Sequence, residues 1–239
     1  MSPGFFTTLV TQPLYNGIVS LLHLAPGLDL GLAVIFFTII IRMILFPLAQ
    51  KSLKTQLALQ SIQPRMEEIK IQYKNDPQQQ AQKMMLLYKE YGVNPFASFL
   101  FLLIQLPIIF GLYFVFLKGG FPTIDPEFLY SFVVPPEKIS TLFLGIFDVT
   151  QKSALLAAFA GISQLLQAQF MKMPTPSNNG DKPSFGSDFA KSLSFQMKYL
   201  FPIIIVFIAY ALPGSVALYW ITSNLFSVGQ EIYLRRHQS

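Results

Sequence analysis

Arg42 is a charged side chain inside an otherwise apolar stretch, residues 30–49. About 20 apolar residues are enough for a helix to cross the roughly 30 Å hydrocarbon core of a bilayer. A guanidinium in the middle of such a helix costs about 2.5–3.5 kcal/mol on insertion scales, so it usually marks a functional site. Glu231 is the one acidic residue in the other apolar stretches, and it lies near the end of the last of them. We therefore expect Arg42 to lack a carboxylate partner in the protein, to be reached by water, and to attract acidic or polar groups.

Polar side chains on the other apolar stretches could line a hydrated groove together with Arg42. They are amides and hydroxyls, which hydrogen-bond to water, to charged groups and to one another. The candidates are Thr38, Gln105, Gln164, Gln167, Thr222, Ser223 and Asn224, together with the neighbouring aromatic residues Tyr219 and Trp220. The same residue types also bridge packed membrane helices, and Tyr and Trp are typical interfacial anchors. A long Arg side chain can also reach the membrane surface without binding anything. The pattern alone fits both interpretations.

Motifs for catalysis are missing from the sequence. There is no cysteine, and the two histidines, His23 and His237, flank the apolar stretches. Neither a zinc-protease motif nor a nucleophile elbow occurs, and no glycine pattern for a nucleotide is present. We expect no enzyme activity, no catalytic residue, no metal and no cofactor.

The composition favours an all-α integral membrane protein. Of the 239 residues, 52% are hydrophobic and 12% charged, whereas soluble domains carry about a quarter charged residues. A single domain, 1–239, is expected, with five transmembrane helices around a hydrophilic groove. The expected elements are an amphipathic interfacial helix (3–24), a first span (30–49), a polar helical hairpin (50–94), a second span (95–117), an outer loop (118–152), a third span (153–171), a linker (172–198), a fourth span (199–212) and a fifth span (214–234).

Individual residues indicate where the elements begin and bend. Asp29 is placed to cap the first span, and Asp76 followed by Pro77 is a typical start for the second helix of the hairpin. Pro64 is expected to kink the first helix of the hairpin.

The basic residues predict the orientation. Thirteen of the 17 Lys and Arg residues lie in 50–94, in 172–198 and after residue 234. The positive-inside rule places these segments and the C-terminus in the cytoplasm and the N-terminus outside. The first 20 residues carry no Lys or Arg, so a cleaved secretory signal is not expected. Acidic residues dilute the charge of the hairpin, so nucleic acid is not an expected partner.

Five segments share their order and spacing with one protein family. They are RMILFPLAQK (42–51), SIQPRMEEIKIQYK (61–74), YKEYGVNP (88–95), IQLPIIFGLY (104–113) and FPIIIVFIAYALPGSVALYWITSNL (201–225). In this respect the chain resembles the YidC/Oxa/Alb family of membrane protein insertases, of the bacterial YidC type, from about Pro13 to Leu234.

The resemblance implies a groove that is closed to the outside and open to the cytoplasm and the lipid, with Arg42 as its single positive charge. The groove amides of the family map to Gln164 or Gln167, and its last-helix aromatic residue to Tyr219 or Trp220. It also implies a bacterial inner-membrane location and nascent membrane proteins as clients within the lipid bilayer. The ribosome and the Sec translocon are further candidate partners.

Two other classes of function remain open at the level of sequence. A small-solute transporter or an anion channel could use Arg42 as its binding charge, although paired repeats are not visible. A non-catalytic assembly subunit could merely hold partner helices together.

Overall fold

The computed structural model describes residues 4–94, 97–118, 121–170 and 199–236, without the side chains of residues 53, 56, 97–105, 117 and 118. The predicted linker 172–198 and the side chain of Gln105 therefore lie outside the described residues. The described part is mostly helical and contains almost no strand, so the all-α prediction is confirmed at this level. Its elements are a π-helical turn Thr7–Thr11, α1 Gln12–Leu24, α2 Leu30–Ile44, α3 Phe46–Ser61, α4 Gln63–Gln72, α5 Pro77–Glu90, α6 Ala97–Lys118, a 3₁₀ turn Pro126–Phe128, β1 Leu142–Phe143, β2 Phe147–Asp148, α7 Ala154–Phe170, α9 Phe201–Ala211 and α10 Gly214–Arg236.

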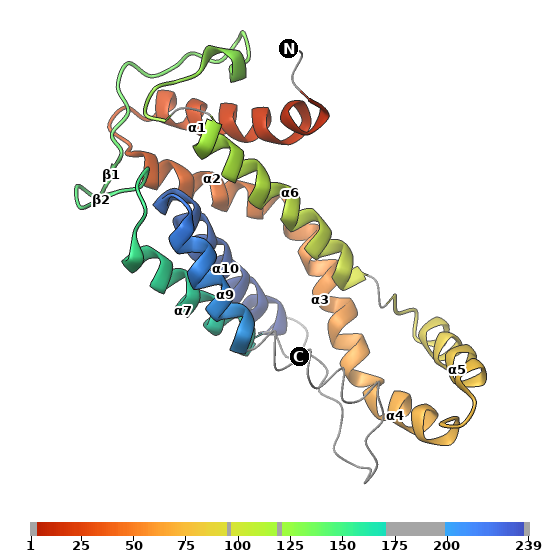
Figure 1. Cartoon of the computed structure of the whole chain (residues 1–239). Helices are drawn as coiled ribbons and strands as arrows, with labels where there is room; N and C mark the ends of the chain where they lie inside the picture. Colours follow the sequence, from red (N-terminus) through yellow and green to blue (C-terminus); the bar gives the residue numbers. More distant parts are fainter. Residues whose placement is uncertain (1–3, 95–96, 119–120, 171–198, 237–239) are drawn as a thin grey trace.

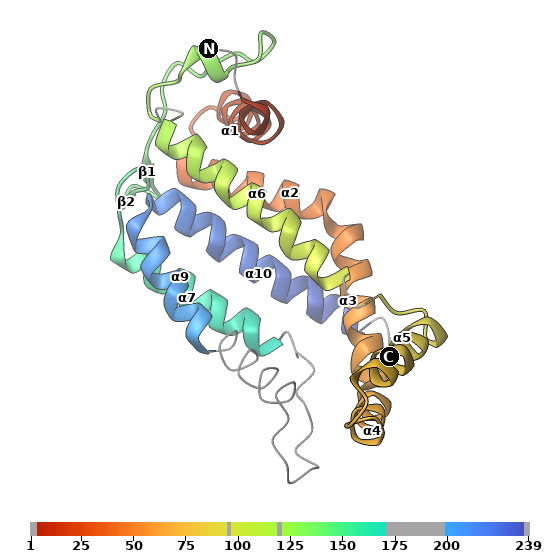
Figure 2. The same ribbon diagram turned by 45° about the vertical axis from the view of Figure 1, so that its right-hand side comes forward.

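The helices form a bundle with an attachment at each end. In Figures 1 and 2, α10 runs through the bundle beside α2, α6, α7 and α9. The closest packing is that of α10 on α7 and α2, and of α7 on α9. Helix α1 lies across the bundle at one end, and α3, α4 and α5 extend beyond it at the other (Figure 1). These two attachments are the predicted interfacial helix and the predicted polar hairpin.

The first predicted span, 30–49, is broken in the structure. Helix α2 ends at Ile44, and α3 continues from Phe46 after a bend of 59°. Pro47 has no N–H to offer the carbonyl of Met43, and the last hydrogen bond of α2 runs from the N–H of Leu45 to the carbonyl of Ile41 at 2.9 Å. Among the described residues, no helix by itself combines the length and the apolar composition that a membrane crossing needs, whereas α2 and α3 reach that measure as a bent pair.

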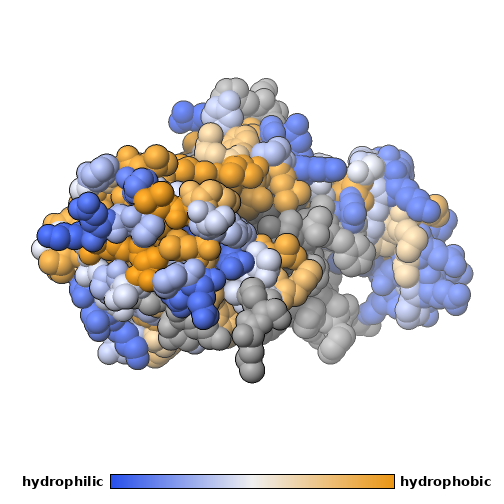
Figure 3. All heavy atoms as spheres, turned by 90° about the horizontal axis from the view of Figure 1, so that it is seen from above, coloured by the Kyte–Doolittle hydropathy of each residue, from blue (hydrophilic) through white to orange (hydrophobic). Residues whose placement is uncertain are grey.

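The polar hairpin contains three helices where the sequence predicted two. The first of them breaks at Ile62, and Pro64 lies in the first turn of α4, where a missing N–H does no harm. Asp76 caps α5 by accepting from the N–H of Gln79 at 2.9 Å, as its position in the sequence suggested. The polar hairpin, at the right of Figure 3, is largely hydrophilic. The face of the bundle seen in this view contains broad apolar areas.

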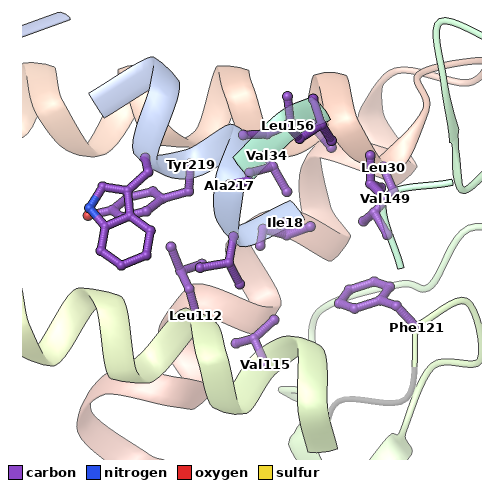
Figure 4. Close-up of a cluster of buried hydrophobic side chains, with 14 of the residues drawn as sticks. Ile18, Leu30, Val34, Leu112, Val115, Phe121, Val149, Leu156, Ala217 and Tyr219 are labelled. Carbon is purple, nitrogen blue, oxygen red and sulfur yellow. The ribbon is translucent and has the colours of Figure 1, made fainter. Parts of the chain in front are cut away.

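Helix α1 packs into the protein along one face. Tyr15, Ile18 and Val19 on this face are fully buried. Figure 4 shows Ile18 of α1, Val34 of α2 and Leu112 of α6 in one apolar cluster. The amphipathic pattern of 3–24 therefore reflects, in α1, contact with the rest of the chain.

The outer loop is fastened to α1 by polar side chains. The side chain of Asn16 donates to the carbonyl of Phe128 and accepts from the N–H of Tyr130, both at 2.8 Å. The Tyr15 hydroxyl accepts from the N–H of Asp125 at 2.8 Å. The loop thus forms an ordered cover over the end of the bundle at which α1 lies.

Candidate functional site

Arg42 lies in the last turn of α2 and points into the bundle. Its side chain is 6% exposed, and Nη2 donates to the hydroxyl of Ser223 on α10. Tyr219 lies one turn before Ser223, on the same face of α10. Cations are favoured at the C-terminal end of a helix, where carbonyl groups lack intrahelical donors. The break at Leu45 therefore places the charge where the backbone of α2 stabilises it.

A second set of hydrogen bonds joins α10 to α7 at the same level. Asn224, next to Ser223, donates from Nδ2 to the hydroxyl of Ser163 at 3.0 Å and to Oε1 of Gln164 at 3.1 Å. The Ser163 hydroxyl donates in turn to the carbonyl of Ala160 at 2.8 Å. Arg42, Ser223, Asn224, Ser163 and Gln164 therefore form a continuous polar layer across α2, α10 and α7. We call these five residues the polar layer.

Two other predicted site residues, Thr38 and Gln167, lie one turn away from members of the polar layer. Thr38 is buried one turn before Arg42, but its hydroxyl donates to the carbonyl of Val34 at 2.6 Å within its own helix. Gln167 is half-buried one turn after Gln164. The side chain of Gln105 lies outside the described residues, as noted above.

The two aromatic residues of α10 are inside the protein. Tyr219 is 2% exposed and Trp220 is 8% exposed. Figure 4 shows Tyr219 at one end of the buried apolar cluster. Such burial differs from the position of an aromatic anchor at a membrane surface. Because Tyr219 and Ser223 are four residues apart, they lie on one face of α10, as Trp220 and Asn224 do.

One member of the polar layer, Ser163, was not selected from the sequence. Ser223 was a candidate for lining the groove, but its bond to Arg42 was not predicted. Both are adjacent to selected residues, Asn224 and Gln164. The spacing of four between Tyr219 and Ser223 was a signal for a shared face, but nothing local in the sequence indicates which of the two faces of α10 meets Arg42.

Glu231, the one acidic residue of the last apolar stretch, pairs within its own helix. Its Oε1 accepts from Nε of Arg235 at 3.1 Å and from Nη2 at 2.7 Å. Gln230, the residue before Glu231, donates to the carbonyl of Phe46 at 3.3 Å, and the rings of Phe46 and Tyr233 lie 6.4 Å apart. The last turns of α10 therefore hold the joint between α2 and α3.

Comparison with known proteins places the chain in a family. The family model described as "60Kd inner membrane protein" matches residues 21–239. The chain belongs to this family. Proteins similar to this chain are named membrane protein insertase, which is the class that the sequence resemblance indicated.

Three similar proteins cover most of the chain. A membrane protein insertase YidC of Clostridium tetani is 34% identical over 88% of this chain and 84% of its own length. One of Fusobacterium nucleatum is 32% identical over 87% of both chains. The membrane protein insertase MisCA of Bacillus subtilis is 29% identical over 98% of this chain and 80% of its own. The recognition of a YidC-type insertase family from the sequence is therefore confirmed.

The polar layer gives this member of the 60Kd inner membrane protein family a defined chemical capacity. A guanidinium binds carboxylates and other anions through charge-assisted hydrogen bonds, which are roughly twice as strong as neutral ones. An entering carboxylate would therefore compete well with the Ser223 hydroxyl for Arg42. The amides of Asn224 and Gln164 can both donate and accept, so they can hydrogen-bond to peptide groups as well as to side chains.

Proposed function

We propose that this membrane protein insertase receives the polar or acidic segment of a nascent membrane protein at the polar layer. In this proposal the five predicted spans enclose a groove that opens to the cytoplasm and to lipid. The N-terminus lies outside and the C-terminus in the cytoplasm of a bacterial inner membrane. The observation that carries the proposal is a buried Arg42 set in a layer of amides and hydroxyls contributed by three helices.

The client helix needs a route to lipid beside the polar layer. Helix α9 exposes Ile203, Phe207 and Tyr210, which are 53%, 70% and 54% exposed. Helix α6 exposes Leu106 and Phe110. An apolar client segment that leaves the groove along α6 and α9 would therefore meet apolar surface throughout, and it would not have to cross a polar barrier.

Partitioning of the client into lipid supplies the driving force. Each Leu, Ile, Phe or Val contributes about 0.3–0.6 kcal/mol at the centre of a membrane helix, whereas an Asp costs about 2.5–3.5 kcal/mol. A client of some 20 apolar residues can therefore offset the passage of one or two charges without a nucleotide. Arg42 acts on the barrier, because it stabilises the carboxylate while that group is away from bulk water.

Client entry requires some rearrangement of the residues around Arg42. The side chain is enclosed, so a carboxylate reaches it only when the residues that cover it move. The joint at Leu45 lies three residues from Arg42 and connects α2 to the cytoplasmic hairpin. Movement of α3 about this joint would admit water and client together from the cytoplasmic side.

Insertion by the purified chain tests this proposal. In proteoliposomes, Arg42→Ala should lower the insertion rate of a single-spanning client with an acidic N-terminal tail by about tenfold, equal to about 1.4 kcal/mol of lost stabilisation. Arg42→Lys should retain most of the activity because it keeps the charge.

Two controls separate the charge attraction from other effects. Lys152→Ala removes an exposed positive charge from the outer side and should leave insertion unchanged. A client whose tail carries Asn in place of Asp should depend little on Arg42. If Arg42→Ala inserts the acidic client at the normal rate, attraction by Arg42 is not the mechanism. Saturable flux of a small anion through the same vesicles would instead favour a transporter.

A further inference from the structure

The β-hairpin of the outer loop presents apolar side chains away from the protein. Leu142, Leu144 and Ile146 are 48%, 62% and 69% exposed. They belong to β1 and to the turn that joins it to β2. A short exposed hairpin is normally built from polar turn residues, because these hydrogen-bond to water and tolerate the turn geometry. Three exposed, large apolar side chains at alternate positions therefore need a physical explanation.

Leu144 adds a second cost at the same place. Its φ is +52°, in the left-handed region that Gly, Asn and Asp adopt more readily than Leu. A residue that is both strained and exposed gains nothing for the fold from its side chain. Such an outlier points to a function for the side chain.

The β-hairpin and the residues beside it are hydrogen-bonded to the first residues of α2 and α10. The N–H of Leu30, the first residue of α2, donates to the carbonyl of Ser140 at 2.8 Å, and the N–H groups of Gly214 and Ser215 donate to the carbonyls of Gln151 and Val149 at 2.8 Å. Asp29 caps α2 through Leu32 and also accepts from the N–H of Leu144 at 3.2 Å. The hairpin therefore satisfies the first N–H groups of α2 and α10 and cannot move far from them.

The apolar tip continues onto the exposed face of α7. Leu155, Phe159 and Ile162 of this helix are 49%, 48% and 59% exposed. Figures 1 and 2 both show β1 and β2 at the margin of the bundle, at the end where α7 begins. The β-hairpin and the exposed apolar face of α7 therefore lie at the same margin of the bundle.

We propose that the tip formed by Leu142, Leu144 and Ile146 inserts into the outer leaflet of the bilayer at the boundary between headgroups and acyl chains. The inference rests on the membrane placement of the proposed function. The tip would fix the outer end of the bundle against the force that a passing client exerts. Near the tip, Glu137 and Asp148 balance Lys138 and Lys152 in charge, and Asp29 adds one buried negative charge, so no positive charge is in excess there. The contact is therefore driven by apolar burial and should not require anionic lipid.

Site-specific labels test the contact, because the chain contains no cysteine. We would place single cysteines by Ile146→Cys at the tip, Phe159→Cys on the exposed face of α7 and Glu127→Cys at an exposed position elsewhere in the outer loop. Each full-length variant is labelled with an environment-sensitive fluorophore and reconstituted in phosphatidylcholine vesicles. Quenching is then measured with lipids that carry a nitroxide near the headgroup and with aqueous iodide.

The Ile146 label should be quenched at least threefold more by the shallow nitroxide lipid than the Glu127 label, and correspondingly less by iodide. Replacing a third of the lipid with phosphatidylglycerol should change this ratio by less than twofold. In a Leu144→Asn background the label should move toward water. The purified chain is the only protein present, so lipid quenching also excludes a protein partner as its cause.

Two results would overturn the inference in distinguishable ways. If the Phe159 label lies in lipid while the Ile146 label behaves like that at Glu127, the tip is aqueous and the membrane placement of the helices stands. If both labels are aqueous, the membrane placement of α7 fails and the tip contact fails with it.

Discussion

The two ends of the bundle are built differently. At the end covered by the outer loop, the buried side chains of Asn16 and Tyr15 hold residues 121–152 through hydrogen bonds of 2.8 Å, and Asp29 joins α2 to the β-hairpin. At the other end, which the proposed function places in the cytoplasm, an exposed ion pair between Arg65 and Glu90 at 3.6 Å links α4 to α5. Directed bonds between buried groups resist opening, whereas exposed ion pairs contribute little. The proposed function, in which clients enter from the cytoplasm while the outer side stays closed, is consistent with this asymmetry.

The largest effect is expected at the outer end, from Asn16→Leu. The substitution removes the groups that bond to the carbonyls of Gln12 and Phe128 and to the N–H of Tyr130. Each buried polar group left without a partner costs about 1–3 kcal/mol, so the free energy of unfolding should fall by about 2–4 kcal/mol. SDS-induced unfolding in mixed micelles measures this change.

A neighbouring amide on the same helix supplies the control for Asn16. Gln12 donates to the carbonyl of Glu127 at 3.5 Å in an exposed position, so Gln12→Ala should change the free energy of unfolding by less than about 0.5 kcal/mol. Equal losses from both variants would show that the outer cover does not depend on the Asn16 bonds. The asymmetry between the two ends would then have lost its main support.

How much of this arrangement the sequence could predict depends on the distance between partners. The caps by Asp29 and Asp76 were predictable, because a cap and its N–H lie three residues apart. The bend at Leu45 was not predicted, because the apolar run continues past it and hides the effect of Pro47. The charge of Arg42 was evident at once. Its partner Ser223 is 181 residues away along the chain, and only the packing of α10 on α2 selects it.

The outer cover shows the same limit more strongly. Residues 118–152 have the composition of a loop, and nothing local in them indicates that Phe128 and Tyr130 meet Asn16. The pairing depends on the fold as a whole. In the same way, Asn224 was a candidate by its type, while its bonds to Ser163 and Gln164 follow from the packing of α10 on α7.

An intermediate effect is expected in the polar layer, from Asn224→Leu. The variant loses two hydrogen bonds to α7, and interhelical bonds of this kind in membrane proteins average about 0.6 kcal/mol. The free energy of unfolding should therefore fall by about 1 kcal/mol, less than for Asn16→Leu. The same micelle titration measures it, with Ser227→Ala as the control because that hydroxyl bonds within its own helix. A loss larger than that of Asn16→Leu would place the most rigid region in the middle of the bundle.

The smallest effect is expected in the polar hairpin, residues 50–94. The side chains of Arg65 and Glu90 are 56% and 64% exposed, and exposed ion pairs contribute about 0.2–1 kcal/mol. A double-mutant cycle of Arg65→Ala and Glu90→Ala should give a coupling energy in this range, reduced further by 1 M salt because the pair is screened. Arg65 also lies over the ring of Tyr91 at 5.5 Å, so Tyr91→Leu separates the ring contact from the ion pair.

Hydrogen exchange completes the comparison, because α4 and α5 should exchange faster than α1 in the same sample. Slower exchange in α4 and α5 than in α1 would mean that the cytoplasmic end is the rigid one, and entry of a client by movement of the hairpin would have to be abandoned.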